Sequence, residues 1–232
     1  MENNELIIYL CIALPMLPVV FAMRDKYSQR FLAFIIAGLT ICLFSAEVNT
    51  LLVNFFKMDE LAYSTTISPI NEEILKAISL IMFTVLFAED KDEILPLAFA
   101  IGIGFSILES INVYCNNMET LTISWAFIRG IGAALMHSAC TAMIAIGISY
   151  VFNYKKSFIQ GIIGLFGSAI LYHATFNAFV QSKYSIVALI MPLLLFIPIN
   201  YIEFKKKQYL QEKTNKSHRK ILITRTSYFH SL

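Results

Sequence analysis

The sequence contains few charged residues. Asp, Glu, Lys and Arg make up 15% of its 232 residues, and hydrophobic residues make up 57%. A soluble domain carries about 25% charged residues. This balance excludes an ordinary soluble globular domain and predicts an integral membrane protein. We expect an all-α membrane helix bundle, because a helix satisfies its backbone hydrogen bonds internally within lipid.

Several common signatures are also missing. No C-x-x-C pair is present, and Cys11, Cys42 and Cys140 lie in apolar runs, so the cysteines are expected to be small core residues. There is no H-E-x-x-H and no G-x-S-x-G motif. The aspartates all fall between the apolar runs, so no pair of membrane aspartates exists. These absences exclude the H-E-x-x-H metal site, the G-x-S-x-G nucleophile and a paired-aspartate site.

Seven apolar runs meet the requirement of roughly 20 residues for a helix that crosses a bilayer. They are residues 5–22, 31–55, 69–88, 94–114, 122–151, 157–180 and 184–204. The acidic N-terminus has no positively charged region, so we expect the first run to remain as a span. The sequence thus predicts one transmembrane domain over 1–204, with a polar core at about 66–180, followed by a basic tail at 205–232.

Basic residues between the runs predict the orientation, since Lys and Arg favour the cytoplasmic side. The first connection holds Arg24, Lys26 and Arg30, and the fifth holds Lys155 and Lys156. With seven spans, these connections share one side with the basic tail, which places the N-terminus outside and the C-terminus inside. The tail residues are Lys205, Lys206, Lys207, Lys213, Lys216, Arg219, Lys220 and Arg225. We expect the tail to bind anionic lipid, and no nucleic acid, because it has no recognisable nucleic-acid fold.

Four polar clusters interrupt the apolar runs. They are Glu72-Glu73-x-x-Lys76, Phe105-x-x-x-Glu109, Arg129 with His137, and His173-x-x-x-Asn177. Ionisable groups in a bilayer are costly, rare and usually functional. In the predicted topology all four clusters fall in the outer half of the membrane. Polar residues without a common function would be expected at different depths, so the shared depth indicates one site. Beside Glu109, residues Gly102, Ser106 and Ser110 form a stripe of small residues that allows close helix approach.

These residue types can hold a metal and activate a water. Catalytic zinc commonly takes three protein ligands of His and Glu type, and Glu109, His137 and His173 would fit. Glu72 would act as general base, with Glu73 orienting the water or joining the ligands, although either carboxylate could be the base. We expect a divalent metal, with zinc the first candidate, but a metal-free water held by Glu and His is the alternative.

Further residues complete the predicted site. Asn177 would stabilise the developing oxyanion, while Lys76, Arg129 and Glu47 would balance charge or serve structure. Structural alternatives exist for residues of three clusters. Glu72 and Glu73 could mark an ordinary helix start, Glu109 could form only an ion pair with Arg129 or Lys76, and Asn177 could link two helices.

The four clusters together resemble the PrsW family of intramembrane metalloproteases. Residues 72–76 look like its E-E-x-x-K motif, and residues 105–109 look like its F-x-x-x-E motif. Residues 129–137 resemble its histidine-bearing motif, and 173–177 resemble its H-x-x-x-N motif. The related CAAX prenyl endopeptidase and bacteriocin-processing branch carries E-E-x-x-x-R and F-x-x-x-H, so Lys76 and Glu109 favour PrsW. One departure is Ser110, where the family often has Asn.

The resemblance implies a multi-pass protease of a prokaryotic cell membrane. It would cut a membrane-anchored protein near the extracytoplasmic face, as in site-1 cleavage of an anti-sigma factor. Two other classes remain open from the residues. Buried acids and histidines also build ion or proton transporters, and a non-catalytic immunity or scaffold protein could keep the same fold.

Overall fold

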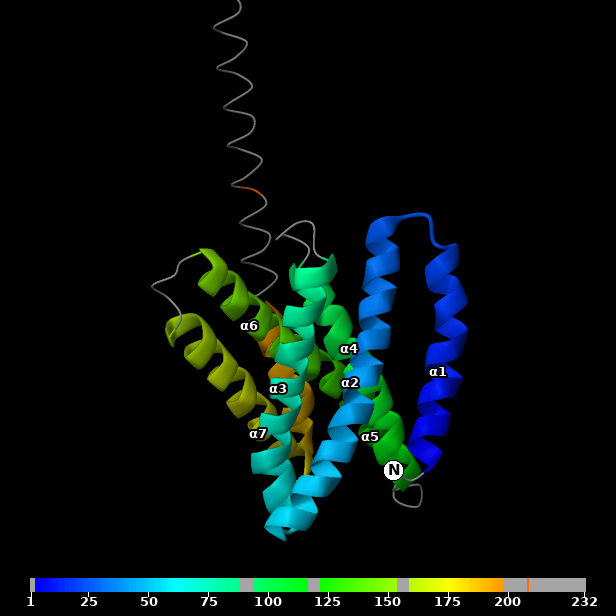
Figure 1. Ribbon diagram of the computed structural model, residues 1–232. Helices are drawn as coiled ribbons and strands as arrows, with labels where there is room; N and C mark the ends of the chain where they lie inside the picture. The colour runs from blue at the N-terminus through cyan, green and yellow to red at the C-terminus, as the bar shows by residue number, and fades with distance from the viewer. Residues whose placement is uncertain (1–2, 88–93, 117–121, 154–158, 198–207, 209–232) are drawn as a thin grey trace, which may run out of the picture. The chain divides into compact units, whose positions relative to one another are not determined.

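The computed structural model describes residues 3–87, 94–116, 122–153, 159–197 and 208 (Figure 1). The acidic connection at 89–93, Lys155, Lys156 and the basic tail from Lys205 onward, apart from Gln208, lie outside the described residues. Residues up to Leu193 form one compact unit, which contains all four polar clusters.

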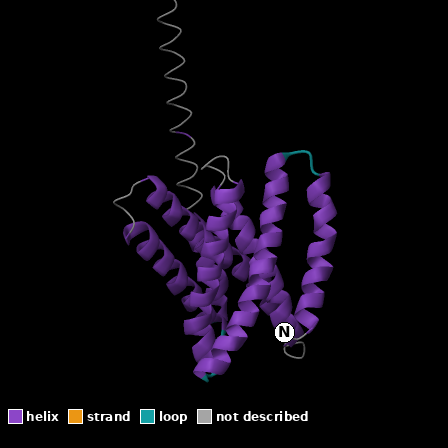
Figure 2. Ribbon diagram, viewed as in Figure 1, coloured by secondary structure: helices purple, strands orange, loops and turns teal. Residues whose placement is uncertain are grey.

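Every long element that the structure describes is a helix, and no strand is present among these residues (Figure 2). The elements are α1 (Asn3–Ala22), α2 (Lys26–Phe56), α3 (Glu60–Phe87), α4 (Ile94–Asn116), α5 (Ile123–Phe127), η3 (Ile128–Ala133), α6 (Ala134–Asn153), η5 (Ile159–Phe166) and α7 (Gly167–Val180). An apolar helix, Ser185–Ile197, follows. The all-α prediction is confirmed.

Four described helical segments are long and apolar enough to cross a membrane. They are Lys26–Phe56, Ile94–Asn116, Ile123–Ile148 and Ile163–Val180, and two shorter apolar helices are Leu6–Ala22 and Ser185–Ile197. Helix α3 is long as well, but it carries Glu72, Glu73 and Lys76 in its middle. The chain therefore has the helices of a membrane protein, and the count of seven crossings and their orientation stay predictions.

Local side chains define where α2 and α3 begin. Asp25 caps α2 by accepting hydrogen bonds from Ser28 N at 2.8 Å and Ser28 Oγ at 2.6 Å. Asp59 accepts from Ala62 N at 2.9 Å at the start of α3. Since α3 begins at Glu60, Glu72 lies about three turns inside the helix. The alternative that Glu72 and Glu73 mark a helix start is therefore excluded.

Glycines allow the helices that carry the site to pack closely. Helix α2 packs most extensively against α4, and α4 against α6. A Cβ on Gly38 would clash with the Ile101 carbonyl, and a Cβ on Gly102 would lie 2.5 Å from Ser138 Cα and N. Contact at Gly102 places α4 directly against the turn of α6 that carries His137.

Helices α5 and α6 are joined by a π-helical turn over residues 128–133 into one continuous run. In a regular α-helix, eight residues at 100° each would leave Arg129 and His137 about 80° apart around the axis. A π-turn accommodates one extra residue per turn. Here it brings both side chains to one face, since both contact the same carboxylate oxygen of Glu109.

Candidate functional site

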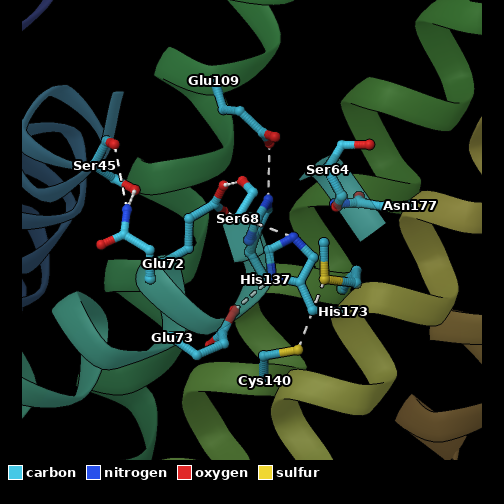
Figure 3. Close-up of polar contacts among 12 residues, drawn as sticks. Ser45, Ser64, Ser68, Glu72, Glu73, Glu109, His137, Cys140, His173 and Asn177 are labelled. Atoms are coloured by element: carbon cyan, nitrogen blue, oxygen red, sulfur yellow. Dashed lines mark hydrogen bonds and ion pairs between the residues drawn. The ribbon is translucent and has the colours of Figure 1, made fainter. Parts of the chain in front are cut away.

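Side chains from four helices converge in the interior of the bundle (Figure 3). Helix α3 contributes Glu72, Glu73 and Lys76, α4 contributes Glu109, α6 contributes His137 and α7 contributes His173. Glu73, Lys76 and both histidines are 0% exposed, and Glu72 is 4% exposed. The Glu109 side chain is 21% exposed. The structure thus gathers residues that are up to 101 positions apart in sequence, from Glu72 to His173, into one buried polar cluster.

Lys76 and Glu73 form the inner part of the cluster. Lys76 Nζ lies 2.8 Å from Glu73 Oε1, one turn away on the same helix. The ammonium also lies 4.0 Å from the centre of the Phe105 ring, a cation–π contact. Phe105 belongs to the F-x-x-x-E cluster, and its ring lies 4.8 Å from that of His137. Phe105 therefore covers the ion pair with an aromatic face.

Glu109 joins α4 to α6 through two contacts. Its Oε2 lies 2.8 Å from His137 Nε2 and 3.0 Å from Arg129 Nη2. Arg129 is itself buried at 6% exposure. The alternative of an ion pair between Glu109 and Arg129 is thus present in the structure, but the same carboxylate also contacts a site histidine.

Hydrogen bonding assigns the ring protons of both histidines. His173 Nδ1 lies 2.8 Å from Glu73 Oε1, so this nitrogen donates its proton to the carboxylate. The lone pair of His173 is then on Nε2. His137 Nδ1 lies 2.7 Å from Lys76 Nζ, which as an ammonium can only donate. The proton of a neutral His137 is then on Nε2, facing Glu109.

Two buried atoms face each other without hydrogen-bond partners among the described residues. His173 Nε2 and Glu72 Oε2 lie 3.7 Å apart, outside hydrogen-bonding range. His173 Nε2 is an acceptor in the assignment above, Glu72 Oε2 is one when the carboxyl group is ionised, and buried acceptors are rarely left unsatisfied. This arrangement needs a third group, either a metal ion or a water, between or beside the two atoms.

A metal ion fits these residues. One ligand atom from each of Glu72, His137 and His173 lies within 4.8 Å of the others. Glu73 holds His173 in the manner of a carboxylate–histidine–metal triad. His137 can join through Nε2 only with its proton on Nδ1, and the Lys76 ammonium, which cannot accept that proton, would then have to move away from Nδ1. The three residues whose ligand atoms lie close enough for one metal ion therefore include Glu72. The prediction from sequence had Glu109 as the third ligand and Glu72 as the general base.

Asn177 is engaged elsewhere. Its Nδ2 donates to the backbone carbonyl of Ser64 at 2.9 Å, which links α7 to the first turns of α3. Gln181 Nε2 reinforces this link with a 2.7 Å bond to Ser64 Oγ. The interhelical hydrogen bond that was the alternative for Asn177 is therefore formed, and the oxyanion role stays a prediction.

Glu47, expected to balance charge, is half-buried on α2, and that role stays a prediction.

Sequence reasoning missed a group of polar residues on α2 and the first turns of α3. On α2, Asn49 donates to Glu72 Oε1 at 3.4 Å. Ser68 donates to the same oxygen at 2.6 Å. The sequence signal for Asn49 was its amide side chain within an apolar run. A buried amide requires hydrogen-bond partners, so this residue could have been expected to contact other polar groups.

Comparison with known proteins identifies the class and then the family. A buried Glu/His cluster inside a bundle of apolar helices is the arrangement expected of an intramembrane hydrolase. The model of the PrsW family of intramembrane metalloproteases matches residues 27–202, and the chain belongs to this family. No curated protein and no solved structure matches the chain.

Proposed function

We propose that this protein is an endopeptidase that hydrolyses a peptide bond of a membrane-anchored protein near the extracytoplasmic face. The observation that supports it is the unpartnered pair of Glu72 Oε2 and His173 Nε2, 3.7 Å apart in a buried polar cluster. A membrane-anchored anti-sigma factor cut at site 1 is the substrate class that the family resemblance implies. Hydrolysis requires a water held near a proton acceptor, and the cluster supplies carboxylates for that purpose.

Within this proposal, Glu72, His137 and His173 would hold a divalent metal, with zinc the expected ion. When bound, the metal would polarise the scissile carbonyl and lower the pKa of a bound water. Glu73 fixes the ring of His173 through Nδ1. Lys76 balances the charge of Glu73, and its contact with His137 Nδ1 would open when Nε2 takes a metal.

The proton acceptor in this arrangement is Glu109. It is the most exposed of the three acids in the cluster, so water and substrate reach it more readily than Glu72 or Glu73. Arg129 holds its carboxylate in place through the 3.0 Å ion pair. The ligand and base roles of Glu72 and Glu109 are thus exchanged relative to the prediction from sequence.

The first experiment measures bound metal in detergent-purified protein and needs no substrate. We expect about one zinc per wild-type chain, as in catalytic zinc sites with three protein ligands. His173→Ala and Glu72→Gln should lose it, whereas Glu109→Gln should retain it. Loss in Glu109→Gln with retention in Glu72→Gln would restore the ligand set predicted from sequence. No metal in the wild type would leave a hydrolase in which Glu and His alone hold the water.

A cleavage assay then separates the enzyme from a transporter or a scaffold. The substrate is a membrane-anchored anti-sigma factor reconstituted with the protein in liposomes. Glu72→Gln and Glu109→Gln should each abolish cleavage. Full cleavage by both Glu72→Gln and Glu73→Gln would contradict the proposed mechanism.

The proposed setting is a prokaryotic cell membrane, with the site in the outer half of the bilayer. The Lys- and Arg-rich segment from Lys205 to Arg225 would bind anionic lipid of the cytoplasmic leaflet, at about 1 kcal/mol per basic residue near the surface. Removal of the segment should weaken binding to vesicles that contain phosphatidylglycerol and leave the metal content unchanged.

A further inference from the structure

A hydrogen-bonded network joins α2 to the Glu72 carboxylate from outside the four polar clusters. Ser68 Oγ donates to Glu72 Oε1 at 2.6 Å, and Asn49 Nδ2 lies 3.1 Å from Ser68 Oγ and 3.4 Å from Glu72 Oε1. Figure 3 shows Ser68 beside Glu72. Both hydrogen bonds therefore reach Oε1, the oxygen of Glu72 that does not face His173.

Two donors fix the orientation of the Asn49 amide. Tyr63 OH and Asn71 Nδ2 each lie 2.8 Å from Asn49 Oδ1. Because Oδ1 accepts both bonds, Nδ2 must point toward Ser68 and Glu72. Asn71 is anchored in turn by Ser45 Oγ at 3.2 Å on α2. Each donor in this chain has an acceptor, as a buried polar network requires if it is to add rigidity.

We propose that Asn49 is a positioning residue for Glu72. Its amide and the Ser68 hydroxyl hold Oε1, and this leaves Oε2 directed at His173 Nε2 across the 3.7 Å gap. The inference rests on the proposed function, in which Glu72 is a metal ligand. Groups that orient a ligating carboxylate typically contribute about 10–100-fold to metal affinity. Helix α2, which carries none of the four clusters, thereby becomes part of the site.

The test uses the full chain in detergent, with Co²⁺ titrated as the probe and thermal unfolding measured on the same samples. Asn49→Leu and Ser68→Ala should bind Co²⁺ about 10–100-fold more weakly than the wild type. Ser68→Thr keeps the hydroxyl and should restore most of the affinity. Tyr63→Phe removes one of the two donors to Asn49 Oδ1 and should have a smaller effect in the same direction.

Thr40→Val is the matched control. Thr40 lies on α2 and takes part in a helix–helix hydrogen bond with Tyr9 OH at 2.9 Å, away from Glu72. Its loss should lower the unfolding temperature, because a bond between helices is removed, but leave Co²⁺ affinity unchanged. Wild-type affinity in Asn49→Leu and Ser68→Ala would overturn the proposal. A loss of affinity in Thr40→Val equal to that in Asn49→Leu would also overturn it, because the effect would then be structural.

Infrared spectroscopy separates this inference from the proposed function. The carboxylate band of Glu72 is identified as the difference between the wild type and Glu72→Gln. Asn49→Leu should shift that band and Thr40→Val should not, whether or not metal binds. A chain that binds no Co²⁺ but shows this shift would refute the metal site and support the positioning role. An unshifted band would refute the positioning role.

Discussion

Lys76 Nζ on α3 lies 2.7 Å from His137 Nδ1 on α6, and both side chains are fully buried. The same ammonium lies 2.8 Å from Glu73 Oε1. Lys76 therefore carries the charge that lets Glu73 remain ionised in the interior, and it also orients one of the two site histidines. A single cation with both roles makes stability and metal affinity depend on the same residue.

We expect Lys76→Met to lower the free energy of unfolding by about 3–5 kcal/mol, because it leaves the Glu73 carboxylate buried without its cation. Denaturant unfolding in a fixed detergent measures the loss. The double variant Lys76→Met/Glu73→Gln should recover part of it, since neither charge then remains. Lys183→Met, which removes an exposed lysine, is the control and should change stability little. Equal stability of Lys76→Met and the wild type would refute the buried ion pair.

Asn177→Ala distinguishes a structural amide from an oxyanion donor. Loss of the bond to the Ser64 carbonyl should cost about 0.6 kcal/mol, the average for hydrogen bonds between membrane helices, and no more than about 1.7 kcal/mol. Co²⁺ affinity should remain at the wild-type value. If the variant keeps wild-type stability and loses only the turnover of a verified substrate, then Asn177 is the oxyanion donor predicted from sequence.

Deletion of Ile131 tests the role of the π-turn. The residue is 45% exposed and lies within 128–133, so its removal can convert the π-turn to a regular helix. Arg129 and His137 would then be seven residues apart, about 20° from the same face. We expect a folded protein that keeps its Co²⁺ affinity. Deletion of half-buried Met143, in the regular part of α6, rotates the following residues by about 100° and should prevent folding. Similar damage from both deletions would contradict the prediction.

Gly102→Ala should separate α4 from α6 next to the site. Its Cβ would lie 2.5 Å from Ser138 Cα and N, which are backbone atoms of α6 and cannot rotate away. We expect a loss of about 1–3 kcal/mol in unfolding free energy, with weaker Co²⁺ binding because His137 precedes Ser138. The control is Gly130→Ala, since nothing lies within 4 Å of a Cβ at that position. Wild-type Co²⁺ affinity in Gly102→Ala would show that the site tolerates helix separation.

The apolar runs predicted where the helices lie in the chain, but they placed the start of α3 too late. Helix α3 begins at Glu60, whereas its apolar run begins at residue 69. The missed turns contain hydroxyl residues that hydrogen-bond to the backbone of the preceding turn, including Thr65 Oγ1 to the Leu61 carbonyl at 2.7 Å. Such bonds hide polarity from lipid. A hydropathy pattern counts these residues as polar and so places the helix start too late.

The sequence predicted which residues form the site but not which role each of them has. Glu72, Glu109, His137 and His173 stood out because charge inside an apolar run is rare. Which oxygen or nitrogen faces which neighbour depends on four helices and one π-turn, and no spacing in the sequence carries that information. Asn49 was missed for a related reason. It is important through its contact with Glu72, 23 positions away.

The sequence by itself determined the class of this protein, because composition and isolated buried charges reflect the cost of polar groups in lipid, which each segment meets alone. The tertiary structure decided the chemistry of the site. It made Lys76 a donor to His137, committed Asn177 to Ser64 and turned Glu72 Oε2 toward His173 Nε2. The physical reason is that hydrogen bonds depend on atomic distances and directions between helices, which are established only when the helices pack.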